Sequence, residues 1–257
     1  MTSEPVPPVR SDAGHLSLHL PDWRMPVVGA VCAGAVAGAA LAGEAWLWAV
    51  VIALQLALVV TWHRSLDAPS AASGAVVGAG LAAIVDVIVA TTGQEPGLGP
   101  IAVVLGAGYL VAVVQQLVRR DGRERLVDGI AATVSLATVA SLGAAWVVIW
   151  QVTGGEDNVV VLAGATCAAA VGRLAPGTNG AALGPLAAGV VAGALLGASV
   201  DDVGLGAALG LAAAVPAGLA AVMQAQVRGA GLGWFAGAVW PVLVAAPLGY
   251  IAVRVVG

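Results

Sequence analysis

The chain has 257 residues, of which 60% are hydrophobic and 9% are charged, and its formal net charge is −4. Soluble domains carry about 25% charged residues, so a chain this poor in charge could not cover the surface of one or two soluble domains. The composition excludes an ordinary cytosolic enzyme, a nucleic-acid-binding protein and a disordered protein. It predicts an all-α fold, a polytopic transmembrane helix bundle.

The first residues differ from the rest of the chain. Residues 1–25 are polar, contain prolines and carry acidic side chains, which predicts a disordered cytoplasmic tail before a transmembrane domain at 26–257. Residues 40–42, Ala-Leu-Ala, resemble a signal-peptidase site, so cleavage of the first span after Ala42 is the alternative.

Nine apolar runs follow the tail. A helix needs about 20 apolar residues to cross a bilayer, and each run is close to that length. The predicted spans are residues 26–42, 45–62, 71–92, 100–118, 130–153, 158–175, 182–200, 205–226 and 233–252.

The charges indicate how the nine spans are oriented. With the N-terminus inside, only Arg254 lies on the outer side, whereas every other arginine lies on the inner side. The outer segments carry the carboxylates Glu44, Glu95, Glu156, Asp157, Asp201 and Asp202. This separation agrees with the positive-inside rule. It predicts a multi-pass protein of the inner membrane with a cytoplasmic N-terminus, and the abundance of Ala, Gly and Val is typical of a GC-rich bacterial genome.

The seventh predicted span carries a stripe of small residues. Gly189, Gly193 and Gly197 are four residues apart and therefore share one helix face. Small residues on one face let helices approach closely in lipid. The stripe predicts close packing either within the chain or in a homodimer, and membrane lipids are the other partners that we expect.

One carboxylate, Asp86, lies inside a predicted span, where ionisable side chains are costly and often functional. In a transporter, Asp86 would be a cation or proton site. In the structural interpretation it is a carboxyl group that is protonated, paired with a neighbouring helix or reached by water. No second charge lies at a matching depth, which favours the structural interpretation. Gln55, Gln115 and Gln116 are expected to make interhelical hydrogen bonds.

Arginines on the predicted cytoplasmic side are candidate contacts for phosphates or lipid headgroups. They are Arg119, Arg120, Arg123, Arg125, Arg173 and Arg228. In the alternative interpretation, the four arginines of the 119–125 loop only orient the chain, and Arg173 places its charged end in the headgroup layer.

The sixth span and the turn after it resemble a known family. Residues 165–173, Ala-Thr-Cys-Ala-Ala-Ala-Val-Gly-Arg, end in a Gly-Arg pair that is followed by Leu174-Ala175-Pro176. Together with nine spans and an internal N-terminus, this segment resembles the phosphatidate cytidylyltransferase family over residues 26–252. The resemblance implies a nine-helix fold. Members of that family join CTP to phosphatidate with the help of a divalent metal.

The chain departs from that family where the main signature is expected. Residues 222–231, Val-Met-Gln-Ala-Gln-Val-Arg-Gly-Ala-Gly, contain no carboxylate and no histidine. Phosphoryl-type transfer needs oxygen ligands that hold the metal, so no catalytic residue is carried over and the chain resembles a degenerate relative. The sequence also has no CxxC, HExxH or histidine cluster, so we expect neither a metal nor a cofactor.

Three functions are consistent with these patterns. The preferred one is a non-catalytic integral inner-membrane protein, because the carboxylates needed for catalysis are missing. The second is a lipid-modifying enzyme of the nucleotide-lipid transferase type, with an atypical cytoplasmic site formed by the arginines. The third is a small-solute or ion transporter that uses Asp86.

Overall fold

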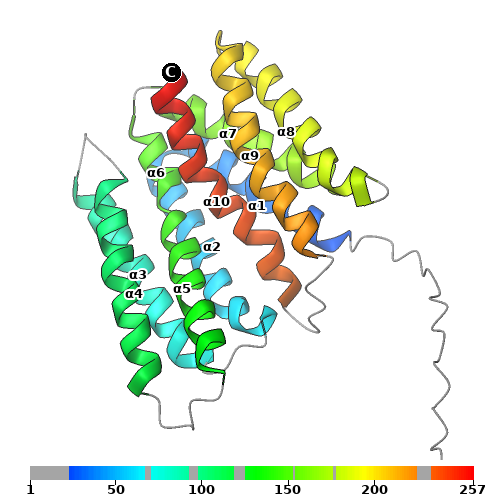
Figure 1. The fold of residues 1–257 in the computed structure, drawn as a ribbon. Helices are drawn as coiled ribbons and strands as arrows, with labels where there is room; N and C mark the ends of the chain where they lie inside the picture. The colour runs from blue at the N-terminus through cyan, green and yellow to red at the C-terminus, as the bar shows by residue number, and fades with distance from the viewer. Residues whose placement is uncertain are drawn as a thin grey trace, which may run out of the picture.

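The computed structural model describes residues 23–66, 71–92, 98–118, 125–152, 154–175, 178–224 and 233–257. Within these ranges every regular element is an α-helix (Figure 1). The helices are α1 (Arg24–Ala42), α2 (Glu44–Ser65), α3 (Ala71–Thr92), α4 (Gly99–Val118), α5 (Leu126–Leu142), α6 (Ala145–Trp150), α7 (Gly155–Gly172), α8 (Thr178–Ser199), α9 (Val203–Gln224) and α10 (Gly233–Val256). The predicted all-α helix bundle is therefore confirmed, while the predicted tail lies almost wholly outside the described residues.

Seven helical segments are long and apolar enough to cross a membrane: α1, α2, α3, α4, the combined α5–α6 segment, α9 and α10. The α7 and α8 helices are not among them. Glu156 and Asp157 lie in the first turn of α7, and in α8 the apolar stretch within the fully described residues is Leu183–Ser199. The protein is thus a multi-pass membrane protein. Each predicted span corresponds to one helix, with a single exception.

The exception is the predicted span 130–153, which is two helices rather than one. The α5 helix ends at Leu142, and α6 begins at Ala145. At the break, the Gly143 amide donates to the Ala140 carbonyl (3.1 Å) and the Ala144 amide donates to the Ser141 carbonyl (3.2 Å). These bonds reach back three residues instead of four, so the α-helical ladder is interrupted in the middle of an apolar segment.

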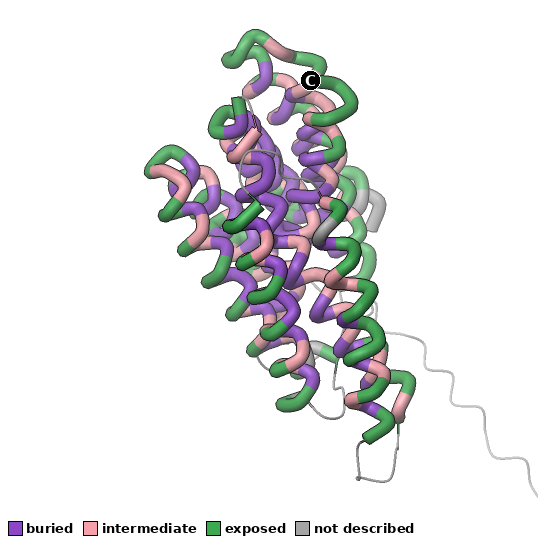
Figure 2. The backbone as a smooth tube through the Cα atoms, turned by 90° about the vertical axis from the view of Figure 1, so that its left-hand side faces the viewer, coloured by how far each residue is buried: buried purple, intermediate pink, exposed green. Residues whose placement is uncertain are grey.

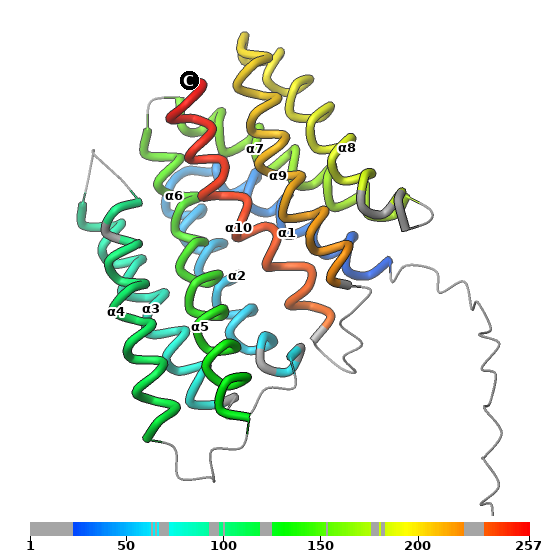
Figure 3. The backbone as a smooth tube through the Cα atoms, in the orientation of Figure 1, coloured from blue at the N-terminus to red at the C-terminus, as the bar shows by residue number. Residues whose placement is uncertain are grey.

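The helices form two groups that share a central contact. On one side, α3 and α4 pack against α5, and on the other side α8 and α9 pack against each other and against α7 (Figure 1). The α10 helix contacts members of both groups, because it packs against α2, α5 and α6 as well as α9. The α3–α4 hairpin therefore lies at one edge of the bundle and the α8–α9 hairpin lies at the other (Figure 3).

Most arginines and most carboxylates of the described helices lie at opposite ends of the bundle, as the sequence predicts. The ribbon brings the starts of the odd-numbered helices α1, α3 and α5 to the same end as the starts of α8 and α10 (Figures 1 and 3). Arg24, Arg64, Arg125 and Arg173 belong to that end. The opposite end carries Glu44, Glu156, Asp157, Asp201 and Asp202. Two described residues depart from this separation: Arg254 lies at the acidic end, and Asp128 lies at the arginine end.

Apolar side chains cover the outside of the bundle as well as its inside. Figure 2 shows exposed positions along the outer faces and buried positions where helices meet. On α4, Val103 is 73% exposed and Leu110 is 65% exposed. A soluble protein rarely exposes so large an apolar surface, whereas lipid chains solvate it without penalty. The exposure pattern agrees with a membrane environment.

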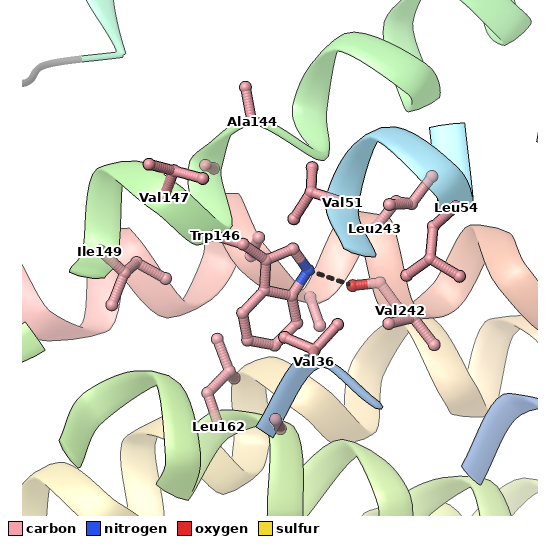
Figure 4. Close-up of a cluster of buried hydrophobic side chains, with 14 of the residues drawn as sticks. Val36, Val51, Leu54, Ala144, Trp146, Val147, Ile149, Leu162, Val242 and Leu243 are labelled. Atoms are coloured by element: carbon pink, nitrogen blue, oxygen red, sulfur yellow. Dashed lines mark hydrogen bonds between the residues drawn. The ribbon is translucent and has the colours of Figure 1, made fainter. Parts of the chain in front are cut away.

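The short α6 helix forms the centre of the core (Figure 4). Its residues 145–149 are all fully buried. The Trp146 indole N–H donates to the Val242 carbonyl of α10 over 3.1 Å, among Val36 of α1, Val51 of α2 and Leu162 of α7. The side chains around the prolines of α10 are equally buried, including Val242, Leu243, Ala245 and Ala246. Through Trp146, the short α6 helix thus packs against α1, α2, α7 and α10.

The glycine stripe of α8 packs within the chain. Gly189, Gly193 and Gly197 are buried and face Gly206 and Gly210 of α9. A Cβ atom added to Gly193 would lie 2.6 Å from the Gly210 Cα, and one added to Gly197 would lie 2.6 Å from the Gly206 Cα. Of the two alternatives left open by the sequence, close packing inside the chain is the one the structure contains. A homodimer stays a prediction. Because α9 covers these three glycines, two copies of the chain would have to meet through another surface.

Candidate functional site

A polar network links three helices in the interior of the apolar bundle. The Gln55 Nε2 atom of α2 donates to Asp86 Oδ1 of α3 over 3.0 Å and to the Ala140 carbonyl of α5 over 3.0 Å. Gln55 is only 3% exposed. It lies eleven residues from the start of α2, or about 16 Å along the helix. The network is therefore far from both ends of α2.

The network lies beside the α5–α6 break. The Ala140 carbonyl accepts the Gly143 amide as well as the Gln55 side chain. A Cβ atom on Gly143 would lie 3.3 Å from the Gln55 Cγ, so the backbone at the break approaches Gln55 closely. Backbone freed from a helix inside a membrane is tolerated where protein buries it or a cavity solvates it. Here a side-chain amide satisfies the carbonyl.

A hollow of about 70 Å³ adjoins Asp86 and Gln55. We call it the α2–α3 groove. Its walls are Ile52, Gln55, Leu56 and Val59 of α2 and Ala79, Ala82, Ala83 and Asp86 of α3. Both sets follow the i, i+3, i+4, i+7 spacing of one helix face. The hollow exists because three of the α3 positions are alanines, which leave space opposite the larger side chains of α2.

The α2–α3 groove opens on the outside of the bundle. Ile52 is 41% exposed and Leu56 is 54% exposed, and Ala83 is also exposed. Asp86 itself is half-buried. It lies six residues before the end of α3 at Thr92, or about 9 Å along the helix. A carboxyl group within the apolar layer therefore borders an opening on the lipid-facing side.

The charge of Asp86 has no cationic partner among the described side chains. Its hydrogen bond within those residues is the one that Oδ1 accepts from neutral Gln55, so no described residue donates to Oδ2. Asp86 is also one of the residues that line the groove. The salt bridge between described residues joins Arg125 Nε to Asp128 Oδ2 over 2.8 Å and does not involve Asp86. An ionised carboxylate without a counter-ion in an apolar layer is unfavourable by several kcal/mol, so Asp86 is suited to take up a proton or a cation.

The other glutamines behave as the sequence predicts. The Gln115 Nε2 atom donates to Ser73 Oγ over 2.6 Å, which joins α4 to α3. The Gln116 Nε2 atom donates to Thr133 Oγ1 over 3.4 Å, which joins α4 to α5. The expectation of interhelical hydrogen bonds is therefore confirmed for Gln55, Gln115 and Gln116. Their role is to fix the positions of neighbouring helices.

The candidate arginines do not form one described cluster. Arg119, Arg120, Arg123 and Arg228 lie outside the described residues. Arg125 is exposed and paired with Asp128, while Arg173 follows the end of α7 and is only 2% exposed. Contacts between these arginines and phosphates or lipid headgroups stay a prediction, and for Arg173 they would require access to a buried side chain.

One polar contact on the acidic end of the bundle was missed by the sequence analysis. The Gln151 Nε2 atom, just after α6, donates to Glu44 Oε1 at the start of α2 over 2.8 Å. Glu44 was predicted only as an outer loop charge. Residues 107 positions apart give no local signal of such a pair, so the sequence could not reveal it.

Comparisons with known proteins identify no relative. No protein-family model matches the chain, and no curated protein or solved structure matches it. The resemblance to the phosphatidate cytidylyltransferases therefore stays a prediction. Within the described residues, no group of three or more His, Cys, Asp or Glu side chains is placed to hold a metal ion.

Proposed function

We propose that this membrane protein is a transporter of a small cation and that Asp86 is the group that binds it. The observation that carries the proposal is the setting of the carboxylate: a neutral amide donates to Oδ1, no described residue donates to Oδ2, and Asp86 is one of the residues that line the α2–α3 groove. A carboxyl group used only for packing would be expected to have both oxygens paired inside the protein.

The broken helix supports the same proposal. Transporters commonly place their sites near the middle of the membrane beside interrupted helices, where backbone carbonyls and side chains meet. In this chain the interruption at Gly143, the Ala140 carbonyl and the Gln55–Asp86 pair are neighbours. The site therefore combines a carboxylate with a backbone segment that is not locked into a continuous helix.

The distribution of charge also indicates in which membrane the protein lies and how it is oriented. Because most arginines of the described helices lie at one end and most carboxylates at the other, with Arg254 and Asp128 as exceptions, we infer an inner-membrane location with the N-terminus in the cytoplasm. No residue takes a catalytic role in this proposal.

Transport can be tested with purified protein in liposomes that enclose a pH-sensitive dye. Sodium, potassium, tetramethylammonium and octyltrimethylammonium salts are added outside in turn. We expect at least one of these cations to change the internal pH with the wild-type protein, because a cation that takes the carboxylate displaces its proton. The change should be lost with Asp86→Asn, which keeps the size of the side chain but removes its charge.

The matched control is Asp128→Asn, which removes a carboxylate from the exposed pair with Arg125. Such a surface pair contributes about 0–1 kcal/mol, so this variant should transport like the wild type. Identical traces from wild type and Asp86→Asn for all four cations would refute the assigned role of Asp86.

A further inference from the structure

We infer that the cation that Asp86 takes is the head of a single-tailed amphiphilic ammonium ion, which enters the α2–α3 groove sideways from the bilayer and exchanges there with one proton. The inference rests on the proposed function and specifies its substrate class. It joins three observations: an apolar groove, its lipid-facing opening and one carboxylate without a described counter-ion.

The groove has the size of a cation head rather than of a whole drug-like molecule. Enclosed ligand sites usually measure about 300–1,000 Å³, whereas this hollow measures about 70 Å³. A hollow of this size holds a few water molecules or a small ammonium group. Any longer part of the ligand must therefore lie outside it, along exposed Ile52 and Leu56, where lipid chains would otherwise lie.

The chemistry of the walls selects a positive charge on an apolar tail. Six of the eight wall residues are Ala, Ile, Leu or Val, and the polar ones are Gln55 and Asp86. The Gln55 amide hydrogens are used by Asp86 and by the Ala140 carbonyl. An anion would meet a carboxylate, and a neutral tail would leave that carboxylate unpaired. A cation satisfies the carboxylate, and its tail matches the apolar wall.

No described charged group competes with the cation at this site. The helices packed against α3 are α2, α4 and α5. Their titratable side chains that the structure describes are Glu44 and Arg64 at the ends of α2, Tyr109 of α4, which is 52% exposed, and Asp128 in the first turn of α5. The neighbour that contacts the carboxylate is the neutral amide of Gln55.

Proton exchange follows because Asp86 has no counter-ion among the residues that the structure describes. In an apolar layer the carboxyl group is neutralised either by a proton or by the ammonium ion, and both cannot occupy it together. Binding of one ammonium ion therefore releases one proton, and the net charge of the site does not change. Release of the ion to either side of the membrane would be accompanied by uptake of one proton.

Proton release is the measurement that tests this inference. Purified protein in lipid nanodiscs, in weakly buffered solution, is titrated with octyltrimethylammonium, whose quaternary head cannot itself release a proton. Bound ligand and released protons are measured together. We expect about one proton for each cation bound at saturation. Asp86→Asn should release none and bind at least about tenfold more weakly, because it loses the charge pair.

A second variant tests the groove without changing the carboxylate. Ala83→Leu adds bulk to an exposed wall position, and Ala90→Leu adds the same bulk to an exposed α3 position outside the wall. We expect Ala83→Leu to weaken binding about tenfold and Ala90→Leu to bind like the wild type. Infrared difference spectra of the carboxyl band should show that Asp86 still takes up a proton in both variants.

The outcomes separate this inference from the proposed function. If sodium or potassium releases the Asp86 proton but octyltrimethylammonium does not, the sideways-entry inference is wrong and a cation site at Asp86 stands. If octyltrimethylammonium binds equally to wild type, Asp86→Asn and Ala83→Leu, it only partitions into lipid and the inference is wrong. If no cation alters the Asp86 carboxyl band, both proposals fail.

Discussion

The close contact between α8 and α9 yields a quantitative prediction for Gly193→Ala. The new methyl group would overlap the Gly206 carbonyl and would lie 2.6 Å from the Gly210 Cα and 2.7 Å from the Gly210 nitrogen. Carbon atoms in contact prefer about 3.5–4.0 Å, so the two helices must separate by about 1 Å. The obstructing atoms belong to the backbone, which cannot rotate away as a side chain can.

The expected loss of stability combines two opposing effects. Overpacking a tight contact costs about 1–3 kcal/mol, whereas replacing a helical glycine with alanine recovers up to about 1 kcal/mol. We therefore expect the free energy of unfolding of Gly193→Ala to fall by about 1–2 kcal/mol. The matched control is Gly38→Ala in α1, because a Cβ atom there meets nothing within 4 Å.

Reversible unfolding in detergent micelles, followed by far-ultraviolet circular dichroism, measures this difference. The control should be neutral or slightly more stable than the wild type. The double variant Gly193→Ala/Gly206→Ala should lose less than the sum of the single losses, because helices that are already apart accommodate the second methyl group. Equal stability of Gly193→Ala and Gly38→Ala would refute the assigned packing of α8 against α9.

Two further predictions concern the core and the orientation. Trp146→Phe should lower the free energy of unfolding by about 1–3 kcal/mol, because the substitution removes the hydrogen bond to Val242 and leaves a small cavity. The control is Trp46→Phe at an exposed position, which should change the free energy of unfolding little in the same assay. In a variant without native cysteines, an impermeant maleimide should label Ser199→Cys on intact cells but Val127→Cys only after permeabilisation, and the reverse pattern would contradict the proposed orientation.

The sequence alone determined the features that depend on local composition. A scarcity of charge identified the membrane class, since a soluble surface cannot be built from so few charged residues. The apolar run lengths located the helices, and the separation of arginines from carboxylates gave the two ends of the bundle. The spacing of Gly189, Gly193 and Gly197 showed that one face of a helix was built for close approach.

Only the tertiary structure decided which partners those features meet. The break at Gly143 was not predicted, because an apolar run looks the same whether or not its backbone ladder is interrupted. The glycine stripe could have faced another chain, and the structure places α9 against it. Asp86 and Gln55 were both recognised as polar residues within spans, yet they lie 31 residues apart in the chain. Their pairing depends on how α2 and α3 are rotated against each other, which is set by contacts between helices rather than by the residues next to either one.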